Sequence, residues 1–577
     1  MIRRRVCRQV NRILRLAARD RGGFNLIVRP FIQEVATAQT PESLVARLAG
    51  QRGIVLLRSA GFDSPQARYS FVAANPFLTF RSFGSRCEVT SFDPQLSTPD
   101  SQLQYGNPWH LLDALMARYE LLDEIDLPFP LGGCFGYWGY DLKNFTEPKL
   151  PRRAVNDLEL PDCHVGFHAS LGVFDHRLGK TCIVATGLGA DGARTEARAR
   201  EQVEFWSDLL ADNPTKTPTP TLSLSERARE KSFPRLANPN ANESRETQEQ
   251  FHPLPGGKGR GEGERRTQSV SSNVTRAEFL SAVERAQRYI RTGDIYQVNL
   301  SQRLAVQFPW WGEAPDEPAR ADTRLAKNSG WELFTRLLAV SPAPFAAFLD
   351  CGDFQIASSS PEQFLRMSGS HIATRPIKGT RPRSADATRD AQLAYELQTN
   401  AKELAELVMI TDLLRNDLGR VCEFGSVQVP ELAHLERFAQ VQHLVSTVEG
   451  RLRPDVTHFA ALASAFPGGS ITGAPKFRAM EIIDELEPIA RGPYCGSLGY
   501  LGFNRESQLS ISIRTAIHKD ATAYFHVGAG IVADSIPEAE YEETLAKARG
   551  FLAALDLKHP SANLQAPEKF QEPNINS

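Results

Sequence analysis

Apolar and polar residues follow two different periods in the first part of the chain. Runs rich in β-branched and aromatic residues, bounded by Gly, Pro, Asp and Asn, predict strands. Such runs occupy 53–61, 69–80 and 169–175. Apolar residues at helical spacing predict helices over 109–122 and 196–211. The stretch from Phe24 to Asp212 is therefore expected to mix strands with helices.

The later part of the chain opens with a helix signal. Thr275-Arg-Ala-Glu278 has the pattern of a capping box and predicts a helix that runs to about Arg291. Helical spacing returns over 323–342, and an extended pattern over 352–367.

Two glycine-rich segments interrupt this pattern. FPGGSITGAPK (466–476) places Pro475 as the first residue of a helix, whose free N–H groups would favour a carboxylate or phosphate. An ordinary loop with a good helix start is the alternative. HVGAGIVAD (526–534) follows a strand and is expected to form a turn at which backbone amides approach a ligand.

Three segments lack the pattern of a packed core. Residues 1–23 carry arginines between apolar residues, and a transit peptide, a membrane-surface helix and a leader from a misplaced start codon all fit; we favour a dispensable extension. Residues 213–273 hold few large apolar residues and are predicted to be a disordered linker, and residues 558–577 a flexible tail. The predicted domains are therefore 24–212 and a catalytic region, 274–557.

Composition and charge exclude several classes of protein. With 41% hydrophobic and 23% charged residues, the 577-residue chain is typical of a globular protein. Its net charge of −2 includes eight arginines before residue 23, so the remainder is acidic and no nucleic-acid partner is expected. Eight cysteines without a C-x-x-C pair fit a reducing cytoplasm. No run of about 18 apolar residues exists, so no membrane span is predicted.

Two predicted helices carry paired carboxylates. Glu403 and Glu406 lie three residues apart on one helical face, and Glu540 and Glu543 repeat this spacing near the C-terminus. Carboxylates from two helices could converge on Mg²⁺, which prefers oxygen ligands. The alternative is a solvated helix face, with Glu543 paired to Lys547 one turn later.

Two further residues have nucleophile chemistry. Lys378 in RPIKGTRPR lies between an extended run and a Gly-Thr turn. A surface lysine is usually only solvated, whereas burial turns a lysine into a nucleophilic amine. Cys134 in GGCFGYWGYD matches the G-x-C-x-G pattern of amidotransferase nucleophiles, but no H-x-E partner follows, so this chain is not expected to hydrolyse glutamine.

Several long motifs in order resemble the chorismate-utilising enzyme family. They are GDIYQVNLSQR (293–303), SSSPEQFLR (358–366), PIKGTRPR (376–383), DLLRNDLGRV (412–421), FPGGSITGAPKFRAMEIIDELEP (466–488), SISIRTA (510–516) and GAGIVADSIPEAEYEET (528–544). The resemblance is strong over 274–557 and looser over 24–212, and within the family it is nearest to the aminodeoxychorismate synthases. It implies an α+β fold, a large two-sheet β-sandwich surrounded by helices.

The resemblance also implies an activity, the conversion of chorismate and ammonia to 4-amino-4-deoxychorismate on the route to 4-aminobenzoate and folate. Lys378 stands where anthranilate synthases have alanine, which implies a covalent nucleophile, and Gln297 stands where isochorismate and salicylate synthases have a lysine that activates water. Glu362 would protonate the leaving hydroxyl, and His443 completes the predicted catalytic set.

The remaining roles are implied position by position. Glu406 and Glu543 resemble the Mg²⁺ ligands, with Glu540 and Glu403 nearby. The implied substrate contacts are Gly379, Thr380, Tyr494, Arg514, Gly528 and Lys547. Four of these, Tyr494, Arg514, the Gly528 amide and Lys547, would hold the enolpyruvyl carboxylate.

The resemblance implies that a separate glutaminase subunit supplies ammonia from glutamine. Leu56-Leu57-Arg58-Ser59 only partly resembles the tryptophan-binding Leu-Leu-Glu-Ser of anthranilate synthases, so feedback inhibition by tryptophan is in doubt. Two alternatives remain open: component I of an anthranilate synthase, and a non-catalytic subunit that binds chorismate or tryptophan.

Overall fold

The structure is a computed structural model that describes residues 29–59, 67–92, 98–122, 127–211, 270–307, 329–438, 441–555 and 557. The predictions made for 1–23, for 558–577 and for most of 213–273 lie outside these residues. Contacts divide the chain into one unit of residues 1–210 and 269–577 and a second of residues 211–268. Only Ala211 of the second unit is described, so the account below concerns the first.

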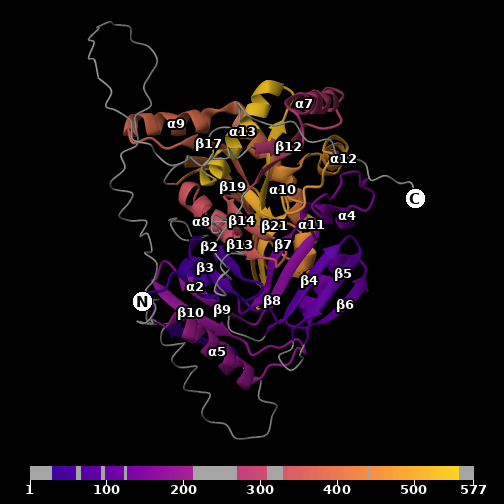
Figure 1. Cartoon of the computed structure of the whole chain (residues 1–577). Helices are drawn as coiled ribbons and strands as arrows, with labels where there is room; N and C mark the ends of the chain where they lie inside the picture. Colours follow the sequence, from indigo (N-terminus) through magenta and orange to yellow (C-terminus); the bar gives the residue numbers. More distant parts are fainter. Residues whose placement is uncertain are drawn as a thin grey trace, which may run out of the picture. The chain divides into compact units, whose positions relative to one another are not determined.

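Two large antiparallel sheets form the body of this unit (Figure 1). The first runs, in spatial order, through β1 (Phe31–Val35), β10 (Lys180–Ala185), β9 (Ser170–Asp175), β3 (Tyr69–Ala73), β2 (Val55–Arg58), β13 (Phe345–Asp350), β14 (Gln355–Ser360), β23 (Thr515–Lys519), β24 (Thr522–Ile531), β12 (Gln297–Gln307) and β11 (Val270–Ser272), with β20 (Gly473–Ala474) paired to β12. The second runs through β17 (Ile377–Pro382), β19 (Val441–Arg451), β16 (His371–Arg375), β15 (Gln363–Ser368), β22 (Glu506–Ile511), β21 (Ser497–Gly502), β7 (Gly133–Trp138), β8 (Cys163–His168), β4 (Leu78–Phe83), β5 (Arg86–Ser91) and β6 (Asp100–Tyr105), with β18 (Gln428–Arg437) paired to β19.

Helices surround the two sheets. The described helices are α2 (Pro41–Arg47), α3 (Pro108–Ala117), α4 (Lys143–Thr146), α5 (Glu196–Leu210), α7 (Arg276–Arg291), α8 (Ser329–Val340), α9 (Ala387–Thr399), α10 (Ala401–Gly419), α11 (His458–Ala465), α12 (Lys476–Leu486) and α13 (Pro537–Ala554). None of the helices in these ranges is both long and apolar enough to span a membrane. The predicted α+β sandwich surrounded by helices is confirmed.

Both faces of the first sheet are apolar, because successive side chains along its strands point to opposite faces. Along β13, Ala347 and Leu349 belong to the apolar cluster between the sheets, whereas Ala346 and Phe348 belong to a second cluster under the helices. Successive side chains of a strand point to opposite faces, so one strand feeds both clusters. The second cluster also holds Phe525 of β24 and Phe551 of α13, whose rings stack at 4.5 Å.

Both halves of the chain contribute to both sheets. In the first sheet β2 pairs with β13, with Leu57 opposite Ala347. In the second sheet β7 pairs with β21, with Tyr137 opposite Leu498 (Figure 1). Residues before 211 and residues after 269 therefore complete one another's hydrogen-bonded ladders.

The helix predictions hold well, and the capping box is present. Thr275 Oγ1 accepts a hydrogen bond from the Glu278 amide at 3.2 Å, and Glu278 Oε2 accepts one from the Thr275 amide at 2.7 Å. Helix α12 begins at Lys476, one residue after the predicted start, with Pro475 as its N-cap.

Two local predictions are wrong. The segment 526–534 was expected to be a turn, but most of it lies inside strand β24. Its glycines serve close approach in a strand, because a Cβ on Gly528 would lie 2.8 Å from both the Leu300 carbonyl and the Tyr494 hydroxyl. The predicted linker also ends too late: Val270–Ser272 form β11, which pairs with β12, and Val270 is buried.

Candidate active site

A bulge in β17 determines which way the predicted nucleophile points. Lys378 pairs with Leu444 and Thr380 with His443, so Gly379 is an extra residue in the ladder, at φ 72°. The extra residue places Lys378 and Arg381 on one face of β17, and Thr380 with His443 on the other. A Cβ on Gly379 would lie only 2.6 Å from Cδ1 of Leu397, so glycine is required sterically as well as conformationally.

The face that carries Lys378 lies against helix α10. The Lys378 ammonium is 3.5 Å from the Glu406 carboxylate, and Arg381 is 3.5 Å from Glu403 one helical turn earlier. The Lys378 side chain is 20% exposed, so it is largely but not fully buried. Gln297 lies next to it: a Cβ on Gly530 would be 2.6 Å from the Gln297 amide nitrogen and 3.9 Å from Lys378 Nζ.

Glu362 is a buried carboxyl beside this lysine. It lies just before β15 and is 7% exposed. Burial raises the pKa of Glu362 to about 7, although the Ser470 hydroxyl, the Lys378 charge and the Ile377 amide each favour its ionised form. Much of the carboxyl is therefore protonated near neutral pH, as a general acid requires.

His443 lies on the opposite face of the β17–β19 pair. Its Nδ1 is 2.9 Å from Thr380 Oγ1, and its ring also hydrogen-bonds the Gly379 backbone. Burial and the nearby Arg514 charge lower the pKa of His443 to about 4, so the imidazole is neutral at pH 7. The Arg514 guanidinium has no carboxylate partner among the described residues, and burial lowers its pKa.

A third group of predicted residues meets at β24. Lys547 Nζ donates to the Gly528 carbonyl at 2.8 Å and forms an ion pair with Glu543 at 2.7 Å. The Tyr494 hydroxyl also lies close to Gly528, 2.8 Å from the position of a built Cβ, and the Tyr494 ring stacks on His526 with centroids 5.0 Å apart. A backbone carbonyl, an ammonium and a hydroxyl thus lie together two residues from Gly530.

The predicted metal carboxylates are close to lysines. Glu406 faces Lys378 and Glu543 faces Lys547, while Glu540 is buried and accepts a hydrogen bond from Ser535 at 2.6 Å. Burial and then the Glu543 charge raise the pKa of Glu540, with Lys402 of α10 acting in the opposite direction. Helices α10 and α13 therefore bring their charged residues close together.

The two predicted carboxylate ligands are of the kind that bind a hard cation which takes few ligands from the protein. Within the ranges described, no group of three or more His, Cys, Asp and Glu side chains is close enough to hold a metal ion. Mg²⁺ is commonly held by one or two carboxylates, with water and substrate oxygens completing its shell. Glu406 and Glu543 supply carboxylate oxygens of the type that Mg²⁺ prefers, and each is paired with a lysine.

Sequence reasoning missed three residues beside the site. Ser470 hydrogen-bonds Glu362, and Lys476 of α12 forms a 2.6 Å ion pair with the buried Asp417 of α10. All three residues belong to motifs quoted for the family resemblance, but spacing along the chain cannot reveal a pair 59 residues apart.

Cys134 lies in β7 between β8 and β21 and is fully buried. Burial raises the pKa of its thiol well above the usual value. An inaccessible, protonated thiol is not a nucleophile for glutamine.

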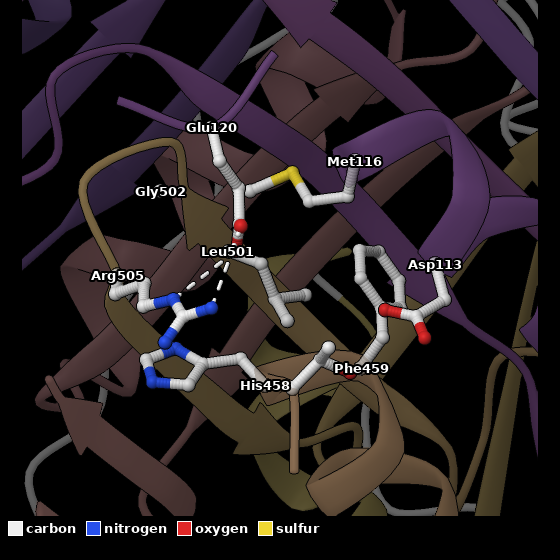
Figure 2. Close-up of a pocket in the computed structure, with 9 residues that line it drawn as sticks. Asp113, Met116, Glu120, His458, Phe459, Leu501, Gly502 and Arg505 are labelled. Carbon is white, nitrogen blue, oxygen red and sulfur yellow. Dashed lines mark hydrogen bonds and ion pairs between the residues drawn. The ribbon is translucent and has the colours of Figure 1, made fainter. Parts of the chain in front are cut away.

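Two further cavities hold none of the predicted catalytic residues. One lies between the sheets beside Leu57, Phe71 and Tyr500, with Arg58 at its edge paired to Glu42. Figure 2 shows the other, between α3 and α11, where Arg505 donates to Glu120 at 3.2 Å. Its His458 is satisfied by Ser507 and the Gly369 carbonyl, so no reaction step is assigned there.

Comparison with known proteins matches residues 60–553 to the model of the chorismate binding enzyme family. Anthranilate synthase component 1 of Acetivibrio thermocellus is 36% identical over 94% of this chain and 97% of its own length. Aminodeoxychorismate synthase component 1 of Escherichia coli is also 36% identical, over 89% and 96%. Among solved structures, anthranilate synthase component I of Streptococcus pneumoniae superposes with a TM-score of 0.64 at 28% identity, covering 90% of this chain and 99% of that one.

Proposed function

The chain belongs to the chorismate binding enzyme family, and we propose that within it the chain is component I of an aminodeoxychorismate synthase. It would convert chorismate and ammonia to 4-amino-4-deoxychorismate and water. The observation that carries the proposal is the position of Lys378, which the Gly379 bulge directs toward Glu406 and next to the buried acid Glu362.

Lys378 would act as the covalent nucleophile. Its amine adds to C2 of chorismate while the C4 hydroxyl leaves, and the Glu362 carboxyl gives that hydroxyl its proton, so water departs. Ammonia then adds to C4 and expels the lysine amine from C2. Two displacements replace one difficult displacement, as in other covalent catalysis. The pKa of Glu362, about 7, leaves a transferable proton on the carboxyl at neutral pH.

The enolpyruvyl carboxylate would lie against the cationic groups near β24. Arg514 is half-buried without a described carboxylate partner, so a substrate carboxylate would supply the missing charge. Lys547 and the Tyr494 hydroxyl both lie close to Gly528 and would hold the same group. His443 lies on the opposite face of β17 from Lys378, and it would act by holding Thr380 and the Gly379 bulge through its hydrogen bonds.

Glu406 and Glu543 would hold Mg²⁺, with Glu540 as a nearby acceptor. A bound Mg²⁺ would neutralise and orient the ring carboxylate of chorismate. Lys378 and Lys547, which pair with these two carboxylates, are the cationic groups that the chain itself presents to the substrate.

Ammonia would come from a separate glutaminase subunit. The buried Cys134 supports this division, since no accessible thiol with a histidine base is found around it. The seven described cysteines are free thiols, which supports action in the cytoplasm.

Anthranilate synthase is the second candidate, because relatives with that name are equally similar. Product analysis separates the two. The purified chain, given chorismate, Mg²⁺ and ammonium, should form aminodeoxychorismate and release no pyruvate. Lys378→Ala should slow this at least 100-fold, and chorismate-dependent mass addition at Lys378 should disappear. Anthranilate plus pyruvate as the wild-type products would refute the proposal.

A further inference from the structure

Two buried charges lie at the unfavourable ends of their helices. Asp417 is in the last turn of α10, and Lys476 is the first residue of α12. The helix dipole disfavours an acid at a C-terminus and a base at an N-terminus. Each helix therefore carries a charge that its dipole disfavours at that end. Natural sequences keep such a charge mainly where it has a functional or structural role elsewhere.

The two charges form one buried pair. Lys476 Nζ lies 2.6 Å from Asp417 Oδ2, and their side chains are only 14% and 4% exposed. The same ammonium donates to the carbonyls of Ala465 and Pro467, at 3.1 and 2.9 Å. All three N–H groups of the lysine are thus used, one on α10 and two on the segment that leads into the glycine-rich loop.

The loop held in this way contacts the proposed acid. Its Ser470 hydroxyl donates to the Glu362 carboxylate. A Cβ on Gly469 would lie 2.6 Å from Leu413 of α10, and a Cβ on Gly468 would lie 2.7 Å from Ile511 of β22. The loop is therefore pressed between α10, which also carries Glu406, and the strands beside Glu362.

We propose that Lys476 and Asp417 are positioning residues, which fix the loop 465–472 to α10 so that Ser470 aligns Glu362 with Lys378 and Glu406. The inference rests on the proposed function, but only on the shared chemistry of chorismate activation and not on which product is formed. Neither residue touches the substrate; both act through Ser470 and α10.

Kinetics of three variants test the proposal. Chorismate consumption and product identity are recorded separately with Mg²⁺ and ammonium, so that a wrong product refutes the proposed function alone. Lys476→Met should lower kcat about 100-fold, since a displacement near 1 Å has that effect, while KM changes less than about threefold. Its Tm should also fall, because Asp417 is left as an unpaired buried charge.

The double variant Asp417→Asn with Lys476→Met separates positioning from stability. Removing both charges should restore much of the lost Tm, but kcat should stay low, because the two loop carbonyls still lack their donor. Recovery of kcat together with Tm would show a purely structural role and overturn the proposal.

Lys143→Met is the control for loss of a buried charge, because Lys143 is fully buried and lies 3.5 Å from Asp141 and 3.9 Å from Asp484, but makes no contact with Asp417 or the carbonyls of Ala465 and Pro467. It should lose stability with little change in kcat. A readout that does not depend on turnover is hydrogen exchange: Lys476→Met should speed exchange over 466–473, and unchanged exchange there would equally overturn the inference.

Discussion

Glu362 acquires its proposed role from its surroundings. The residue is 7% exposed, and burial outweighs the Ser470 hydrogen bond and the Lys378 charge, so the pKa rises to about 7. A carboxyl in water would be ionised at that pH and could not donate a proton. The environment alone allows an ordinary glutamate side chain to keep its proton near neutral pH and to serve as a general acid.

The first prediction concerns pH. At a fixed concentration of unprotonated ammonia, kcat/KM for chorismate should fall as pH rises through about 7, because Glu362 loses the proton that it must donate. The Glu362→Gln variant should have a kcat/KM about 100-fold lower or more, and this value should no longer fall as pH rises through about 7. Initial rates across pH, with total ammonium adjusted at each point, provide the measurement. If kcat/KM of the glutamine variant still falls in the same way as pH rises, the pH dependence belongs to another group.

The second prediction concerns the carboxylates of α10 and α13. Glu406→Gln or Glu543→Gln should abolish Mg²⁺-dependent turnover without unfolding the protein. Tm should change least for Glu543→Gln, because its exposed pair with Lys547 contributes little stability, whereas the Glu406–Lys378 pair is largely buried. Glu542→Gln, an exposed neighbour on the same helix, is the control and should behave as wild type. Full turnover of either site variant in the presence of EDTA would show that the reaction does not depend on a metal ion held by these carboxylates.

Individual residues show where sequence reading reaches its limit. Motif positions were enough to select Lys378, Glu362 and Glu406, and the structure brings them together. Ser470 and the Asp417–Lys476 pair could not be predicted, because their meaning depends on side chains that meet only after α10, β15 and the glycine-rich loop have packed.

At the scale of elements, the β17 bulge is the feature on which the site depends. One extra residue, Gly379, reverses the face of everything after it, so that Lys378 and Arg381 both meet α10 although they are three apart on a strand.

Gly379→Ala should therefore reduce activity more than stability alone explains. The new Cβ would meet Leu397 at 2.6 Å in a left-handed backbone, so the strand must shift and move Lys378. We expect a loss of about 1 to 3 kcal/mol in unfolding free energy and at least a 10-fold loss in kcat. Gly425→Ala is the control, with φ 78° and open space around it; it should lose stability only. Equal kcat in both variants would contradict the proposed role of the bulge.

Most elements could be predicted because their signals are local. The capping box, the paired carboxylates and the helical spacing of α5, α10 and α13 depend on neighbouring residues. There are two exceptions. Strand β24 is rich in glycines, which leave room for neighbouring side chains and resemble a turn signal. Strand β11 has only three residues, too few to show the alternation of apolar and polar residues that predicts a strand.

At the scale of the molecule, the two halves of the chain form one body. In each sheet the strands from before residue 211 form one block and those from after residue 269 form another, and the blocks join where β2 pairs with β13 and β7 with β21, so neither half has a complete sheet of its own.

The fourth prediction is that replacing residues 213–268 with a flexible Gly/Ser bridge leaves kcat and Tm nearly unchanged. The segment holds few large apolar residues and so contributes little to a core, and a flexible bridge of comparable length keeps the reach between Leu210 and Val270. Extending the deletion to 273 should lower Tm, since it removes β11. Collapse of soluble expression in the shorter deletion would show that the segment contributes to folding.

The pairing of β2 with β13 and of β7 with β21 also sets a problem for synthesis on the ribosome. The first residue of β13 emerges about 290 residues after the last of β2, so at roughly 5 to 20 residues per second the nascent β2 edge waits about 15 to 60 seconds for its partner. The β7 edge waits longer still. During that interval the chain carries two open, apolar strand edges, which are sites of mispairing between neighbouring nascent chains. Slow translation or scarce chaperone should therefore reduce the yield of this protein more than that of one whose sheets close in chain order.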